Sequence, residues 1–155
     1  IVRMATELGV GDVQLVQRER DAPQFGADAP KLERLRRIAI EACAQSEQAF
    51  APELSGPVPL MAAVQAAPAA AHKLACVERS AAAPWPSLAA NAEGGAWLMV
   101  GPEGGFTDAE LSLLLDSGFR AVSLGQAVLR VETACVVACA LAFDRLRTRP
   151  ATPTP

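Results

Sequence analysis

The ten residues AWLMVGPEGG, positions 96–105, form the clearest strand-to-helix junction in this sequence. The first five are an uncharged apolar run, which is typical of a strand buried on both faces of a sheet. The last five form a glycine-rich loop, behind which Thr107 and Glu110 stand at the spacing of a helix capping box. We therefore expect a buried strand, a loop and a capped helix that ends at Gly118.

The same order of strand and helix extends to both sides of this junction. We expect helices over residues 1–8, over 31–50, over 132–147 and, in short form, within 52–71, and strands over 12–16, 73–77 and 121–124. Strands that alternate with helices at this spacing pair in parallel, because each helix returns the chain to the same end of the sheet. The sequence predicts an α/β fold, with a mainly parallel sheet flanked by helices.

Length and composition limit the class of protein. The chain has 155 residues, 51% of them hydrophobic, which suits one ordinary domain. Its longest uncharged stretch lies between Glu53 and Lys73 and is interrupted by prolines, so we expect no membrane span. No segment has the pattern of a secretion signal, which favours the cytoplasm. Fourteen basic against seventeen acidic residues give a net charge of −3, opposite to the usual footprint of a dedicated nucleic-acid-binding domain.

The cysteines and the chain ends carry less information. Four cysteines include no CxxC pair, and the single His72 stands away from them, so we expect no metal and interpret the thiols as small buried groups. The chain starts at Ile1 without an initiator methionine, and we interpret it as a piece of a longer protein. Residues 150–155 are rich in proline and are expected to be a disordered tail.

Two loops fall where a parallel sheet binds ligands, at the carboxyl ends of its strands. The first loop spans residues 101–105, and its glycines permit a close approach of the backbone to a ligand. It is neither a GxGxxG fingerprint nor a phosphate-binding P-loop, and a plain tight turn is the alternative interpretation. The second loop spans residues 124–134, where Arg130 and Glu132 are either substrate contacts or a surface ion pair at a helix start.

Taken together, the two loops resemble a known signature. The motif GPEGGF followed by T-x-x-E (101–110) and the motif LGxxxLRxETA (124–134) are similar to those of the bacterial small-subunit ribosomal RNA uridine-N3 methyltransferases of the SPOUT superfamily. The stretches ATELGV (5–10), Glu-Arg (19–20) and EACAQS (41–46) resemble the same family in the same order. The resemblance extends over nearly the whole chain.

The resemblance implies a fold and an activity. Residues 1–149 would form a SPOUT methyltransferase domain with a trefoil knot near the C-terminus, an exception to the rule against threaded chains. The domain would bind S-adenosyl-L-methionine in the knot and methylate N3 of a specific uridine in small-subunit (16S) ribosomal RNA. The family implies a homodimer, with neither a membrane nor a metal as partner. It also implies an N-terminal PUA-like RNA-binding domain, which this chain lacks.

The same resemblance assigns roles to individual residues. Arg130 would stabilise the negative charge that develops on the uracil oxygens, and Glu132 would orient Arg130 or relay the proton. Arg20, Arg34, Arg36 and Arg37 are candidate RNA contacts, with a solvated helix face as the alternative for the last three. The residues expected to hold the cofactor are Val77, Glu78, Gly101, Pro102, Glu103, Gly104, Gly105, Leu124, Gly125, Val128, Leu129, Arg130 and Thr133.

Several positions depart from the family pattern. Members usually have arginine where this chain has Ala127 and Gln48, glutamate at Ala44, a serine or cysteine at Asp21 and threonine at Val131. The loss of two arginines leaves open a second interpretation, a divergent non-catalytic dimeric module for RNA binding or ribosome assembly. A third interpretation, a generic nucleotide-binding α/β domain, rests on the glycine-rich loop alone.

Overall fold

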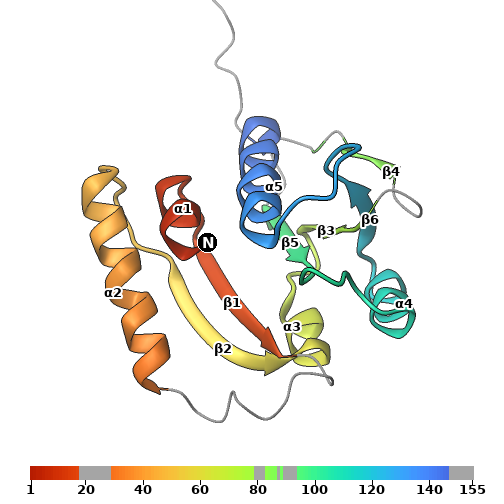
Figure 1. Cartoon of the computed structure of the whole chain (residues 1–155), viewed down its shortest axis with the longest axis horizontal. Coiled ribbons are helices and arrows are strands. Elements are labelled where there is room, and N and C mark those ends of the chain that lie inside the picture. Colours follow the sequence, from red (N-terminus) through yellow and green to blue (C-terminus); the bar gives the residue numbers. More distant parts are fainter. Residues whose placement is uncertain (18–28, 79–82, 87, 89–93, 147–155) are drawn as a thin grey trace, which may run out of the picture. The chain divides into compact units, whose positions relative to one another are not determined.

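The structure is a computed structural model that describes residues 1–17, 29–78, 83–86, 88 and 94–146. The chain divides into two compact units, residues 1–66 and residues 67–155. Figure 1 shows the elements in chain order. The predicted tail (150–155) and Arg20 lie outside the described residues.

The first unit is a two-stranded parallel sheet with three helices. Its elements are α1 (Val2–Glu7), β1 (Asp12–Gln17), α2 (Ala29–Gln45), β2 (Glu53–Pro59) and α3 (Leu60–Ala66). β1 and β2 pair in parallel, with Val13 opposite Leu54. Val2, Ala39 and Leu54 are buried together and join α1, α2 and β2 in one small core.

The pairing of β1 with β2 depends on a glycine. The register shifts between Gln14 and Val16, and Gly56 lies against the Leu15 backbone at this irregularity. Gly56 has a φ of +95°, and a Cβ at this position would press against the carbonyl oxygen of Leu15. Both the backbone conformation and the lack of space therefore require glycine at position 56.

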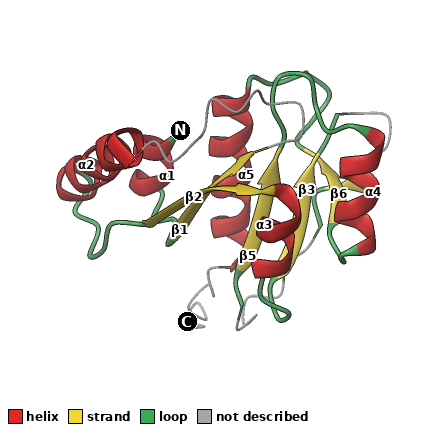
Figure 2. Cartoon of the chain, turned by 90° about the horizontal axis from the view of Figure 1, so that it is seen from below, coloured by secondary structure: helices red, strands yellow, loops and turns green. Residues whose placement is uncertain are grey.

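The second unit is a four-stranded, fully parallel sheet flanked by helices. Its elements are β3 (His72–Cys76), β4 (Ala83–Pro84), β5 (Ala96–Val100), α4 (Asp108–Asp116), β6 (Arg120–Ser123) and α5 (Val131–Leu146). The strand order is β4-β6-β3-β5, so β6, the last strand in the sequence, lies between two earlier strands. In Figure 2 the strands lie between α5 and α4.

The core of this unit lies between the sheet and α5. Leu74 and Val122 are buried in one cluster with Ala138 and Ala142 of α5, so small residues let this helix approach the sheet closely. Ala75 alternates with Leu74 along β3, and it is also buried, on the opposite face of the sheet. Burial on both faces explains why the strands of this sheet read as continuous apolar runs.

The junction at residues 96–110 has the predicted form. Thr107 begins α4: its side chain accepts from the Glu110 backbone N–H at 3.2 Å, and the Glu110 carboxylate accepts from the Thr107 N–H at 2.8 Å. At the other end, Gly118 follows the helix with a φ of +85°, and the Phe119 N–H returns to the Leu114 carbonyl at 3.0 Å. The capping box and the glycine stop were both readable from the sequence.

The α/β class and the parallel pairing are confirmed, and some elements differ from expectation. The helix expected over residues 31–50 ends at Gln45, and β2 occupies a segment for which only a short helix was predicted. Proline is disfavoured inside a strand, but β2 belongs to a two-stranded sheet, where proline is tolerated. β4, two residues long, was not expected. No helix in the described parts of the chain is long and apolar enough to cross a membrane.

We predict that Gly56→Ala destabilises the first unit by about 1–3 kcal/mol, because it forces a side chain into a left-handed conformation and against a backbone oxygen. Urea unfolding followed by far-ultraviolet circular dichroism measures the change. Gly11→Ala is the matched control, because a Cβ at Gly11 meets nothing within 4 Å and its φ is ordinary. Equal unfolding midpoints for the two variants would refute the role given to Gly56.

Candidate functional site

Parallel pairing brings the carboxyl ends of β3, β5 and β6 to one edge of the sheet. The loops that leave these strands line a cavity of about 290 Å³. The lining includes residues 76–78 after β3, residues 100–106 after β5 and residues 123–125 after β6. Open parallel sheets bind ligands at this position, so the cavity is the candidate site.

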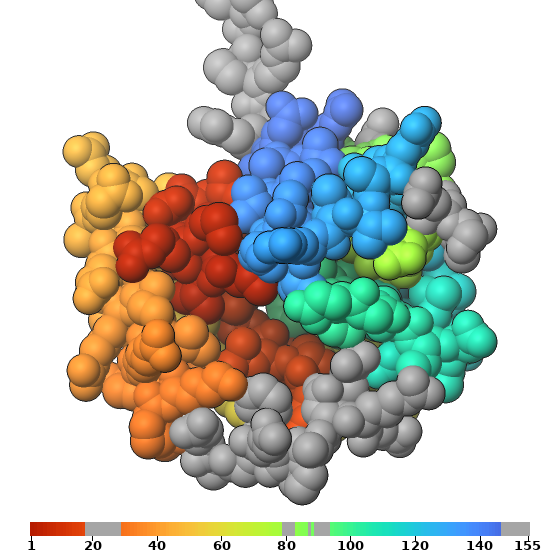
Figure 3. All heavy atoms as spheres, in the orientation of Figure 1, coloured from red at the N-terminus to blue at the C-terminus, as the bar shows by residue number. Residues whose placement is uncertain are grey.

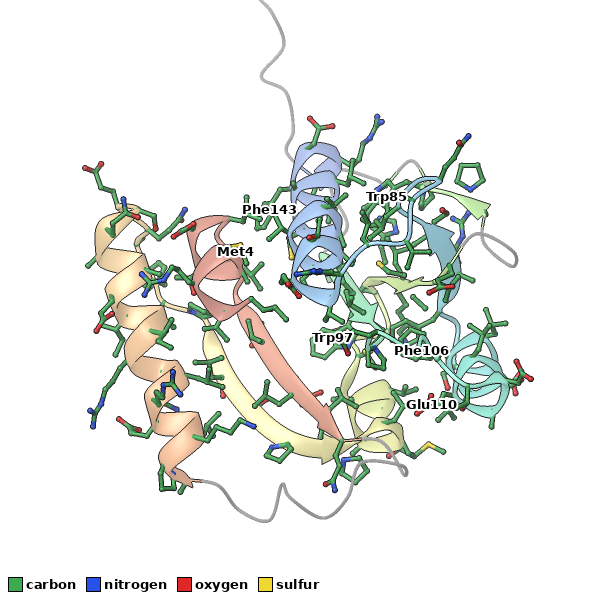
Figure 4. All side chains as sticks on the ribbon, viewed as in Figure 1. Met4, Trp85, Trp97, Phe106, Glu110 and Phe143 are labelled. Carbon is green, nitrogen blue, oxygen red and sulfur yellow. The ribbon has the colours of Figure 1, made fainter. Side chains whose placement is uncertain are left out.

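The loop after β5 is shaped by two of its glycines. A Cβ on Gly101 would lie 3.2 Å from the Phe106 ring, which is closer than an ordinary contact. Gly105 has a φ of +67°, and its N–H donates to the Pro102 carbonyl at 2.8 Å, which closes a tight turn. Figure 4 shows Phe106 and Glu110, the two labelled side chains at the entry to α4. The loop backbone thus folds back beside the cavity, with few side chains in the way.

The loop after β6 is fixed by one hydroxyl. The Ser123 Oγ accepts a hydrogen bond from the Gly125 N–H at 3.2 Å and donates to the Gly125 carbonyl at 2.9 Å. Gly125 has a φ of +135°, a conformation that side chains rarely adopt. Ser123 and Gly125 together set the direction in which the chain leaves the sheet and turns along the cavity.

The charges around the cavity all have one sign. Glu78, Glu103 and Asp108 line it, and among the described residues its lining includes no lysine, arginine or histidine. Carboxylates attract a cationic ligand and repel a phosphate, and the effect is moderate because all three residues are exposed. The electrostatics therefore favour a ligand with positive charge.

Most of the expected cofactor residues lie together. Those in the cavity lining are Val77, Glu78, Gly101, Pro102, Glu103, Gly104, Gly105, Leu124, Gly125, Val128 and Leu129. The other two, Arg130 and Thr133, are exposed at the start of α5 and do not line the cavity. Arg130 directly follows Leu129, so it stands at the end of the cavity-lining loop.

Sequence reasoning missed part of the lining. The residues missed are Cys76, Val100, Phe106, Asp108, Leu111, Ser123, Ala127, Val131 and Ala134. A signal for four of them was present, because Asp108 with Leu111 and Val131 with Ala134 are each three residues apart, on one face of a helix start. Ala127, one of the departures from the family pattern, also lies in this lining.

Arg130 and Glu132 do not form the ion pair that was the alternative to a functional role. In the described part of the chain neither side chain has an ion-pair partner, and both are exposed. The Arg130 carbonyl accepts from the Ala134 N–H at 2.8 Å, the first turn of α5. Glu132 lies in that first turn, where the helix dipole favours a carboxylate.

The three candidate RNA-binding arginines of α2 belong to the other unit, and the structure separates them into two kinds. The Arg36 guanidinium lies 3.7 Å from the Glu33 carboxylate and donates to the Leu54 carbonyl at 3.4 Å. Arg34 and Arg37 are exposed and have no such partner among the described residues. Arg36 therefore contributes to the packing of α2 on β2, whereas the other two extend to solvent.

Three free thiols lie close together beside the cavity, those of Cys76, Cys135 and Cys139. Burial raises the pKa of Cys76 to about 12 and that of Cys135 to about 11, with smaller contributions from the neighbouring thiols. Burial also raises the pKa of Cys139. These groups remain protonated at neutral pH. Cys76 is buried, as expected, whereas Cys135 and Cys139 are only partly buried.

Comparison with known proteins relates this arrangement to a family. The model of the RNA methyltransferase domain family matches residues 1–143. Ribosomal RNA small subunit methyltransferase E of Synechocystis is 38% identical over 146 residues, which cover 90% of this chain and 46% of that protein. The protein of the same name from Aquifex aeolicus is 35% identical over 137 residues, covering 88% of this chain and 58% of its own length. This chain thus spans about half the length of these relatives.

Solved structures give the same relationship. A crystal structure of ribosomal RNA small subunit methyltransferase E from Neisseria gonorrhoeae, bound to S-adenosyl methionine, superposes with a TM-score of 0.80 at 33% identity. The match covers 90% of this chain and 57% of that one. A Legionella pneumophila protein in complex with the cofactor SAM superposes with a TM-score of 0.78 at 31% identity, covering 92% and 59% of the two chains.

We predict that Cys76 and Cys135 resist alkylation in the folded protein. At pH 8 a thiol with a pKa near 12 is ionised in about one molecule in 10⁴, against about one in ten for a pKa of 9.0. Timed treatment with iodoacetamide, followed by mass spectrometry of peptides, measures the rate at each cysteine, with the urea-unfolded chain as control. Modification of Cys76 at the unfolded rate would show that the thiol is not buried.

Proposed function

This chain belongs to the RNA methyltransferase domain family, and from that premise we propose that it is the cofactor-binding part of a larger ribosomal RNA methyltransferase. The whole enzyme would bind S-adenosyl-L-methionine and methylate N3 of a specific uridine in small-subunit (16S) ribosomal RNA. The observation that carries the proposal is the cavity at the ends of β3, β5 and β6, which gathers the two motif loops and is lined by their glycines and by carboxylates.

The residues present fit this cofactor. S-adenosyl-L-methionine carries a sulfonium and an ammonium against one carboxylate, so its net charge is positive, and Glu78, Glu103 and Asp108 complement that charge. The glycines of both loops bring backbone amides and carbonyls to the cavity, and such groups recognise an adenosyl moiety without a cationic side chain. The apolar side chains of Leu124 and Leu129 offer contact to an adenine ring.

The chemistry assigns separate roles to the residues beside the cavity. When bound, S-adenosyl-L-methionine supplies an electrophilic methyl group. The site would place the uracil N3 in line with that group, and positioning of this kind accounts for much of the rate in group transfer. Arg130 would donate hydrogen bonds to a uracil oxygen as N3 loses its proton and negative charge develops. Glu132, two residues along, would orient Arg130 or accept the proton.

The proposal extends to topology and assembly. By resemblance to the family we assign a trefoil knot to the second unit, and the strand order, with β6 between β4 and β3, is compatible with that path of the chain. By resemblance to the family, the protein acts as a homodimer in the cytoplasm, with small-subunit ribosomal RNA as its partner. An N-terminal PUA-like domain would belong to the rest of the protein.

One observation favours a second function, a non-catalytic dimeric module for RNA binding or ribosome assembly. Ala127 lies in the cavity lining at a position where family members usually have arginine. The third interpretation, a site for nucleotides, is less compatible with the structure, since three carboxylates would repel phosphate groups. The two experiments that follow separate these alternatives.

We predict that this chain binds S-adenosyl-L-methionine in isothermal titration calorimetry and does not bind ATP. Replacement of two lining carboxylates, Glu103→Gln with Asp108→Asn, should weaken cofactor binding about three- to tenfold, since each exposed carboxylate contributes a modest attraction. The pair Asp116→Asn with Asp144→Asn removes the same charge from positions of the same unit that do not line the cavity, and is the matched control. Saturable ATP binding without S-adenosyl-L-methionine binding would refute the proposal.

We predict that Arg130→Ala, introduced into the full-length protein, lowers uridine methylation by about 10²-fold or more, because it removes stabilisation of developing charge. Cofactor affinity should stay unchanged, because Arg130 is exposed and does not line the cavity. Primer extension on small-subunit ribosomal RNA detects the methylated base. Arg145→Ala, at the opposite end of α5, is the control. Methylation at the wild-type rate would exclude Arg130 from catalysis, and persistence of the base in a deletion strain would favour the non-catalytic module.

A further inference from the structure

Helix α2 concentrates positive charge in an otherwise acidic chain. Its seventeen residues include four of the fourteen lysines and arginines but only two of the seventeen aspartates and glutamates. The helix is therefore positive while the rest of the chain is negative. A local field of this kind attracts a polyanion even when the net charge of the whole molecule does not.

The helical period distributes the α2 arginines around the helix axis. Ala39 and Ala42 are buried and define the inner face. At 3.6 residues per turn, Arg34 and Arg37 lie about 60° apart on the outer side, while Arg36 lies about 100° from Arg37, toward the flank. Figure 3 shows the atoms of α2, in orange, at the surface of the face in view.

Arg36 also differs from Arg34 and Arg37 in its contacts. Arg36 is held by the Glu33 carboxylate at 3.7 Å and the Leu54 carbonyl at 3.4 Å. Arg34 and Arg37 are exposed, with no hydrogen bond or ion pair to the described residues. Glu41, a carboxylate on the outer side, lies 3.9 Å from the Arg3 guanidinium of α1. Two guanidinium groups one helical turn apart are thus left available to a partner.

We propose that Arg34 and Arg37 bind phosphates of the RNA backbone, and that Arg36 positions α2 on β2. A guanidinium offers a planar pair of donors that matches two phosphate oxygens, and it binds without regard to sequence. The choice of RNA as occupant rests on the proposed function and on charge complementarity. Arg34 and Arg37 would increase the affinity for RNA, and other residues would select the uridine.

The experiment measures RNA affinity as a function of salt. A fluorescein-labelled oligouridylate is titrated with this chain in KCl between about 50 and 200 mM, and binding is followed by fluorescence anisotropy. Each phosphate contact to a single strand contributes about 0.7 to the slope of log K against log salt, so Arg34→Gln with Arg37→Gln should lower the slope by about 1.4. Arg36→Gln removes a charge from the same helix; it should leave the slope unchanged and lower the urea midpoint.

The outcomes separate this proposal from the proposed function. A double variant that retains the wild-type slope, or wild-type protein that does not bind the oligouridylate, would overturn the proposal. An equal loss of slope in Arg36→Gln would also overturn it, since the effect would then come from general charge. Calorimetry with S-adenosyl-L-methionine tests the cofactor site independently, and a reduced slope in protein that binds no cofactor would support this face while refuting the proposed enzyme. Preference for an acidic polypeptide over the oligouridylate would reject RNA as the occupant.

Discussion

Parallel pairing of β3, β5 and β6 is the constraint on which the second unit depends. Because the strands run in one direction, every connection must return across the sheet, and α4 makes that return between β5 and β6. The same direction gathers the three carboxyl ends at one edge. The motif loops, about twenty residues apart in the sequence, become the walls of one cavity for this reason, and neither loop could form the site alone.

Local signals made much of this fold predictable. The apolar run 96–100, the capping box at Thr107 and the stop at Gly118 are each determined by neighbouring residues, and the structure has all three. β2 was missed because its prolines argue against a strand, and the tolerance for them comes from a two-stranded pairing that local sequence does not specify. The two-residue β4 is defined mainly by its partner β6.

In the candidate site, too, some residues were predictable from the sequence and others were not. Loop residues such as Gly101 and Gly125 were predictable because motif and strand position agree, and both line the cavity. Cys76 and Ala134 were missed because their place in the lining depends on how β3 and α5 approach the loops. The α2 arginines were indistinguishable in sequence, and only the contacts of Arg36 with Glu33 and Leu54 separate it from its neighbours.

The position of β6 has a consequence for how the protein acquires its structure. Translation delivers β3, β4 and β5 before β6, yet β6 lies between β4 and β3. Before β6 is synthesised, the position between β4 and β3 is therefore vacant. β4 has no partner among the described strands until residues 120–123 leave the ribosome. Such distant pairing in sequence is slow to form and leaves strand edges open to aggregation. The ligand cavity, which needs the loop after β6, can only be completed at this late step.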